Sequence, residues 1–258
     1  MQRISSFLLL ALLMIGLSTN AMAQDHFEGR ITYSAYQISN DGRPQSDGDQ
    51  LNLFITPDRL LINDLDSYKV MGNLRSNGIL IRLDQRDFVI LSDDDVALQI
   101  TKDDIDDMMA MMKGFASWSG DSDKQQPQMP ETNIERTGRK KEISGYDCYE
   151  IVVTDPEKPD EKTNLWMTDD LNVNWGMLTE AWGSGSNSFF PNGIPMNDLL
   201  QNGALPLRVE HYKEGHMSDM MEVNTVKKSK VARAMVQIPQ GVEVLGFRDY
   251  IMRQMQQQ

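Results

Sequence analysis

The chain of 258 residues contains one cysteine and three histidines, and this scarcity limits the chemistry open to it. A lone cysteine, Cys148, cannot form an internal disulfide, so the fold has to rest on packing. Serine or cysteine catalysis needs a histidine base, and the candidates are His26, His211 and His216. The sequence has no Gly-x-Ser-x-Gly elbow and no glycine-rich phosphate loop. We therefore expect a protein that is not an enzyme and that uses no cofactor.

Basic residues are also few compared with acidic residues. Lys and Arg number 25 against 38 Asp and Glu, which gives a net charge of −13. Such a chain repels phosphate backbones, so we expect no nucleic-acid partner. Two short basic runs, Arg139-Lys140-Lys141 and Lys227-Lys228-Ser229-Lys230, adjoin strand-like sequence and are interpreted as solvated strand edges.

Long apolar runs are missing except at the N-terminus. Arg3 is followed by the uncharged run Phe7 to Leu17, and Ala21-Met22-Ala23 has the small-x-small pattern that signal peptidase accepts. The run is about a dozen residues long, against about 20 for a bilayer span. We expect a cleavable signal peptide over 1–23 and a mature periplasmic or secreted protein without a transmembrane anchor. No cysteine follows the cleavage site, so a lipoprotein is not expected.

The rest of the chain, 24–258, is expected to be one β-rich domain. Apolar and polar residues alternate from Phe27 to Ala35, which is typical of a strand with one wet face. About ten or eleven strands follow from such alternation and from turn signals. The further expected strands are 51–55, 59–62, 79–83, 88–91, 96–100, 133–141, 148–153, 164–168, 205–212 and 217–226. Consecutive hairpins exclude a doubly wound parallel sheet and favour an α+β fold, mainly antiparallel, with helices on one side of the sheet.

One helix is clearly indicated. Apolar residues recur at helical spacing over 103–118, and Thr101 with Asp104 has the spacing of an N-cap and its N3 partner. Two other segments stand out: an irregular Trp/Gly/Asn-rich insertion at about 174–203, and an amphipathic C-terminal tail over 246–258.

Methionine and tryptophan are the unusual components, with 18 Met and four Trp. Flexible thioethers and aromatic rings line promiscuous apolar sites, although a methionine-filled core explains the same spacing. If a cavity exists, the residues predicted to line it are Met108, Met112, Phe115, Trp118, Trp166 and Trp182.

A metal site is the remaining chemical candidate. Glu210, His211, Glu214 and His216 surround one hairpin turn. With a four-residue loop the two imidazoles would face each other, whereas a two-residue loop puts them out of register. Two histidines alone do not complete a zinc site, so His211 and His216 stay weak candidates.

Five segments together resemble the DUF4412 family of exported bacterial proteins. They are Phe27 to Tyr33, Gly145 to Ile151, Leu165 to Leu171, Leu205 to Glu210 and Val236 to Val242. That family is similar to the lipoprotein carriers typified by LolA and LolB, whose curved, incomplete antiparallel barrel has a mouth covered by helices and holds lipid chains. The resemblance implies a half-barrel here, with the Met108–Phe115 helix as a lid.

Three hypotheses on function follow. The first is a non-enzymatic periplasmic protein that binds an apolar small molecule, lipid or acyl chain. The second is an interaction module in which 174–203 docks an envelope protein. The third is a metal-dependent hydrolase that uses His211 and His216.

Overall fold

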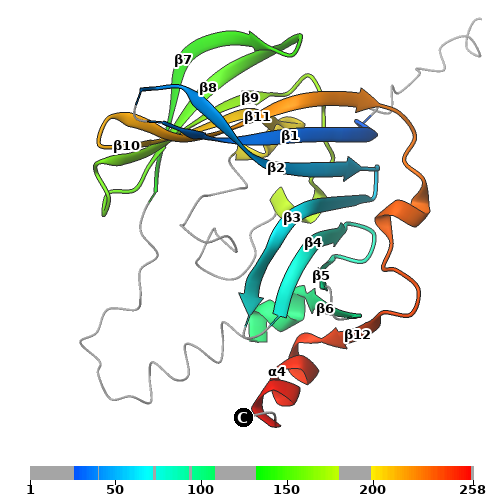
Figure 1. Cartoon of the computed structure of the whole chain (residues 1–258). Coiled ribbons are helices and arrows are strands. Elements are labelled where there is room, and N and C mark those ends of the chain that lie inside the picture. Colours follow the sequence, from blue (N-terminus) through cyan, green and yellow to red (C-terminus); the bar gives the residue numbers. More distant parts are fainter. Residues whose placement is uncertain are drawn as a thin grey trace, which may run out of the picture.

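The computed structural model describes residues 26–39, 41–71, 74–92, 95–107, 132–179 and 199–256. These residues form a single open sheet of twelve strands that curves strongly (Figure 1). The strands are β1 (Gly29–Ile38), β2 (Pro44–Ile55), β3 (Arg59–Met71), β4 (Leu74–Arg82), β5 (Asp87–Ser92), β6 (Val96–Thr101), β7 (Asn133–Ile143), β8 (Tyr146–Thr154), β9 (Glu161–Thr168), β10 (Leu205–Lys213), β11 (His216–Lys228) and β12 (Glu243–Gly246).

The sheet consists of two antiparallel meanders joined side by side. The order across it is β12-β6-β5-β4-β3-β2-β1-β11-β10-β9-β8-β7. The first meander runs from β1 to β6 and the second from β7 to β11. Antiparallel pairing of β1 with β11 joins the two, for example Ile31 with Val226. The predicted curved, mainly antiparallel half-barrel is confirmed.

One strand departs from the predicted series of hairpins. β12 returns along the chain to pair with β6 in parallel, with Glu243 opposite Val96. The expected count of ten or eleven strands missed it. A strand of four residues that pairs with a segment far back in the sequence leaves no alternation or turn signal of its own.

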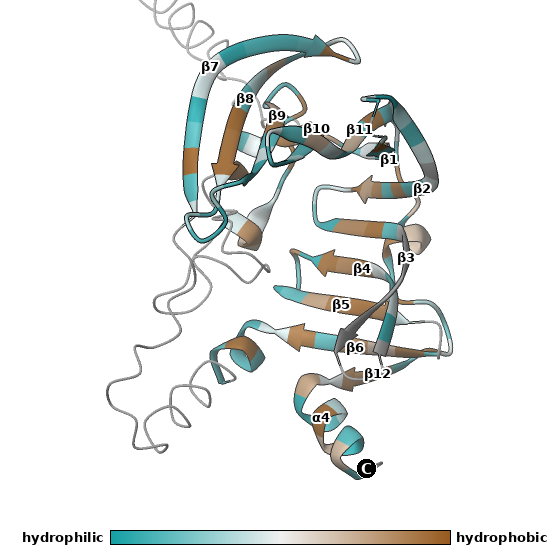
Figure 2. Cartoon of the chain, turned by 60° about the vertical axis from the view of Figure 1, so that its left-hand side comes forward, coloured by the Kyte–Doolittle hydropathy of each residue, from teal (hydrophilic) through white to brown (hydrophobic). Residues whose placement is uncertain are grey.

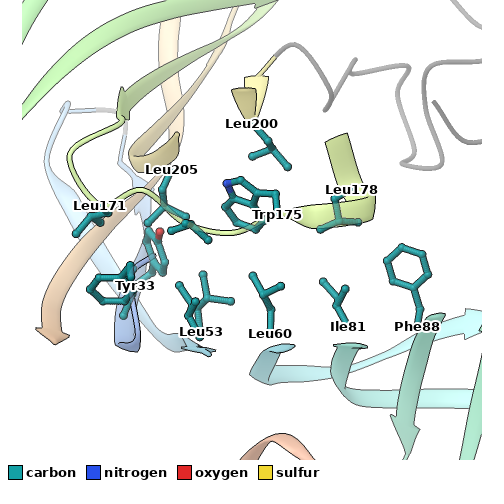
Figure 3. Packing of buried hydrophobic residues seen from close by; sticks show 14 of the residues in the cluster. Tyr33, Leu53, Leu60, Ile81, Phe88, Leu171, Trp175, Leu178, Leu200 and Leu205 are labelled. Carbon is teal, nitrogen blue, oxygen red and sulfur yellow. The ribbon is translucent and has the colours of Figure 1, made fainter. Parts of the chain in front are cut away.

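We call the concave side of the sheet the inner face. It carries the largest apolar cluster, with side chains from most strands packed against residues 171–178 and against Leu200. Figure 3 shows part of this packing, with Leu60 and Ile81 pointing from the sheet toward Trp175 and Leu178.

We call the opposite side the outer face. Over β2 to β6 it carries a smaller apolar cluster that includes Leu61 and Leu80. The short helix η3 (Arg233–Val236) covers this cluster with Val236, which is 1% exposed. The buried Arg59 holds the covering segment, because its Nη1 donates to the Val236 carbonyl at 3.2 Å and its Nη2 bonds Asp84 at 2.8 Å.

Helical structure is limited in the described residues. The predicted helix begins as expected and is helical over 102–107. Its capping box is confirmed: the Thr101 backbone N donates to Asp104 Oδ2 at 2.8 Å, and the Asp104 backbone N donates to Thr101 Oγ1 at 3.2 Å. The C-terminal tail forms α4 (Phe247–Gln256), with Tyr250 buried. None of the described helices is both long and apolar enough to cross a membrane.

Candidate functional site

A row of buried apolar side chains lines the inner face. It passes from strand to strand across the first meander, and every member is at most 5% exposed. The row consists of Tyr33 on β1, Leu53 on β2, Leu60 on β3, Ile81 on β4 and Phe88 on β5 (Figure 3). Strand alternation explains the row, because each residue occupies the inward position of its strand.

An irregular segment covers this row. Leu171, Val173, Trp175 and Met177 alternate with more exposed neighbours, and all four are buried against the sheet. Regular structure in this segment includes the short helix η1 (Gly176–Thr179) and, on the returning chain, η2 (Gln201–Gly203). We call residues 171–179 with 199–205 the cover.

A small number of hydrogen bonds fix the cover. The Trp175 indole N–H donates to the Ala204 carbonyl at 2.8 Å, and the Val173 N donates to the Gly203 carbonyl at 3.0 Å. Gly203 has a φ of +71°, and a Cβ there would lie 2.8 Å from the Asn172 backbone, so only glycine allows the two passes to touch. The Asn174 amide donates to the Pro57 carbonyl at 2.7 Å and so ties the cover to the β2–β3 turn.

Two polar groups inside this cluster are satisfied. Tyr33 donates its hydroxyl proton to the Pro206 carbonyl at 2.9 Å, and burial raises the pKa of Tyr33 far above its usual value. The Trp175 N–H is bonded within the cover, whereas the buried Trp166 Nε1 has no hydrogen-bond partner among the described residues. The row from Tyr33 to Phe88 is thus suited to apolar contact rather than to acid–base chemistry.

Most predicted lining residues fall outside the described part of the chain. These are Met108, Met112, Phe115, Trp118 and Trp182, and their role as lining residues stays a prediction. Trp166 is described: it is 7% exposed and belongs to the largest apolar cluster, together with Tyr33 and Trp175, and its role as a lining residue also stays a prediction. Its neighbours Leu165 and Met167 pack in a separate apolar cluster with Leu199 and Ala204.

Trp166 sits in a row of charged residues that crosses four strands. Glu150 on β8, Trp166 on β9, Arg208 on β10 and Glu222 on β11 are successive cross-strand neighbours. The Lys141 ammonium lies 3.9 Å from the centroid of the indole ring, which is a cation–π contact. We call these residues, with Arg139, Asn164 and Glu210, the ionic cluster.

The centre of the ionic cluster is a fully buried carboxylate. Glu150 is 0% exposed and accepts hydrogen bonds from Thr137 Oγ1 at 2.6 Å and from Asn164 Nδ2 at 3.0 Å. The Arg139 guanidinium forms a two-pronged ion pair with it. Thr137 and Arg139 lie where β7 bulges away from β8, so this carboxylate holds the bulge in place.

A second carboxylate completes the network. Glu210 Oε1 lies 2.7 Å from Arg208 Nε and 3.7 Å from Lys141 Nζ, and its other oxygen accepts from the Tyr212 hydroxyl at 3.1 Å. Burial, reinforced by Arg208, lowers the pKa of Lys141 despite the opposing effect of Glu210. Burial and Glu210 raise the pKa of Tyr212. Each charge here has a partner, so the cluster is built as a structural network.

The histidine pair does not come together. The β10–β11 turn has two residues, with Lys213 opposite His216 and His211 opposite Asp219. His211 Nδ1 instead lies 3.3 Å from Thr163 Oγ1 on β9. The four-residue loop that would make the imidazoles face each other is not what forms. Within the described ranges, no three His, Cys, Asp or Glu side chains are grouped so that they could hold a metal ion.

Cys148 is buried, and a basic residue does lie near it in space. Lys141 faces it across the β7–β8 pair, which sequence distance did not indicate. Burial nevertheless has the larger effect and raises the pKa of the thiol to about 11. The thiolate is therefore disfavoured at neutral pH.

The fold defines a class before any relative is considered: an open, curved and mainly antiparallel half-barrel. The model of the family "domain of unknown function (DUF4412)" matches residues 97–242. The chain belongs to this family, as the resemblance in sequence predicted.

Two solved structures match this chain at low identity. A structure of PNGF-II matches with a TM-score of 0.50 and 16% identity over 89% of this chain and 33% of that protein. The complex structure of Pseudomonas aeruginosa MucA/MucB matches with a TM-score of 0.40 and 12% identity over 84% of this chain and 58% of the other. This chain thus spans about a third of the length of PNGF-II. A search of curated proteins finds no significant match.

Proposed function

We propose that this protein is an exported, non-enzymatic binding protein that holds an apolar ligand, a lipid or acyl chain, against the inner face of its curved sheet. One observation carries the proposal. In the part of the chain that the structure describes, the buried row from Tyr33 to Phe88 packs against the irregular cover, and no second sheet lies over it.

The cover gives the proposal a mechanism. Trp175 and Leu178 occupy the space above Leu60 and Ile81, so the ligand takes the place of these side chains when the cover moves aside (Figure 3). Burying an acyl chain contributes about 0.8 kcal/mol per methylene, which is enough to replace the lost contacts of the cover. No charged group on the ligand is required.

The compartment follows from the N-terminal sequence. A positive n-region, an apolar run of signal-peptide length and a small-x-small site support export to the periplasm or beyond. The metal-dependent hydrolase is not proposed, because the two histidines are paired with different residues.

The test is titration of the full mature protein with a fluorescent fatty acid, alongside native mass spectrometry of protein purified from its envelope. Wild type should take up the probe. Trp175→Ala should bind it about tenfold more tightly, because the variant removes the side chain that competes with the ligand. Leu61→Ala is the control, since it removes a buried apolar side chain from the cluster on the outer face, and its affinity should stay unchanged. Absence of uptake by both wild type and Trp175→Ala would rule the proposal out.

A further inference from the structure

Strand β7 is an open edge of the sheet. It is last in the strand order, and among the described residues only β8 pairs with it. β7 has eleven residues and is mostly exposed, whereas β12 at the opposite edge has four. In Figure 1 the β7–β8 hairpin forms the rim of the half-barrel. Unpaired backbone groups along such an edge are ready to pair with another extended chain.

The edge carries charge of the opposite sign to the rest of the protein. Its sequence, NIERTGRKKEI, has four Arg or Lys and two Glu, a net charge of +2 (4 − 2), while the whole chain carries −13. Figure 2 shows most of β7 in hydrophilic colour, in contrast to β4 and β5. The edge is thus a basic strip on an acidic molecule.

Two of these cations remain available to a partner. Arg139 and Lys141 are engaged by Glu150 and Glu210 in the ionic cluster. Arg136 instead stacks on Tyr149, with its guanidinium carbon 3.7 Å from the ring centroid, and neither it nor Lys140 forms an ion pair with a described carboxylate. Both lie on the side of β7 away from Glu150, one before and one after the bulge.

We propose that the β7 edge accepts an extended acidic segment of a protein partner as an additional strand. The bulge divides the edge into two stretches that pair regularly with β8, 133–136 and 140–143. The partner strand forms backbone hydrogen bonds with both stretches. Its carboxylates meet Arg136 and Lys140. Lysines and bulges protect edges against self-association, and here they exclude a second copy of β7 by like charge while leaving an acidic strand favoured.

The test uses the full mature protein and a fluorescein-labelled peptide of alternating valine and glutamate, with binding followed by fluorescence anisotropy. The double variant Arg136→Glu/Lys140→Glu should bind the peptide at least about tenfold more weakly. The control Lys228→Glu/Lys230→Glu makes the same change in net charge at the end of β11 and just beyond it, and should bind like wild type. A peptide of alternating valine and lysine should bind the β7 variant and not wild type, which shows that the variant edge is still formed.

Backbone pairing is tested separately. N-methylation of alternate residues of the Val–Glu peptide should abolish binding. The unmodified Val–Glu peptide should slow hydrogen exchange of the β7 amides in the wild-type protein. The proposal is overturned if both double variants lose affinity equally, if N-methylation has no effect, or if the peptide does not bind. Fatty-acid uptake by the β7 variant should match wild type, so this result and the proposed function stand or fall separately.

Discussion

Strand β9 presents two different solutions to burial on its two faces. Leu165 and Met167 lie on one face among Leu199 and Ala204, in contacts that need no specific partner. Trp166 and Asn164 lie on the other face and are also less than one-tenth exposed, but ion pairs and a cation–π contact surround them. The first face depends on filled volume, whereas the second face, across β8–β11, depends on every charge finding its partner.

The largest effect should come from the centre of the ionic cluster. Glu150→Ala leaves Arg139, Asn164 and Thr137 without their acceptor and frees the β7 bulge. We expect a loss of about 3–5 kcal/mol in the free energy of unfolding, measured by urea denaturation, because several hydrogen bonds to one buried carboxylate, each worth about 1.5–3 kcal/mol, are lost together. Glu135→Ala on the exposed side of β7 should change it by less than about 0.5 kcal/mol. A Glu150→Ala loss below about 1 kcal/mol would show that the network is not needed for the fold.

The inner face should respond to lost volume. Leu60 is fully buried beneath the cover, so Leu60→Ala should cost about 3 kcal/mol in urea denaturation. Leu60→Met keeps the volume and should cost less than about 1.5 kcal/mol. Equal losses for the two substitutions would contradict tight packing at this position.

A smaller effect is expected where the inner face uses one hydrogen bond. Tyr33→Phe removes the hydroxyl that donates to the Pro206 carbonyl and keeps the ring. We expect a loss of about 1 kcal/mol in the free energy of unfolding. Thr225→Val, on an exposed position of β11, is the control and should be near neutral. No change for Tyr33→Phe would mean that water replaces the bond at no cost.

Local sequence patterns predicted the parts of the fold that depend on local rules. Alternation from Phe27 to Ala35 located β1, and the spacing of Thr101 and Asp104 located a capping box that the structure contains. Trp175 and Met177 of the cover fall within the segment predicted to be irregular, about 174–203, although Leu171, Val173, Trp175 and Met177 alternate as a strand does. That alternation indicates which side chains are buried. It does not indicate a strand here, because the segment pairs with no sheet in the described part of the chain.

The ionic cluster could not be predicted in the same way. Arg139 meets Glu150 through a bulge, and Arg208 meets Glu222 across a hairpin, so each pair depends on register. A shift of one residue would send these charges to the other face. The sequence predicted Trp166 as a residue that lines an apolar cavity. It gave no sign that Lys141 and Arg139 would lie beside the ring.

Cys148 gives a pH-dependent difference between the native and unfolded chains. Burial raises the pKa of the thiol from 9.0 to about 11, so the unfolded chain releases this proton first as pH rises. The stability that the buried thiol contributes is fully present below about pH 9 and is lost between about pH 9 and 11. Cys148→Ala should therefore show a smaller fall in urea midpoint over this interval than wild type. The buried tyrosines titrate in both proteins, so the difference between the two curves isolates the thiol. Parallel curves would show that Cys148 ionises equally well in the native state, and would contradict its burial beside Lys141.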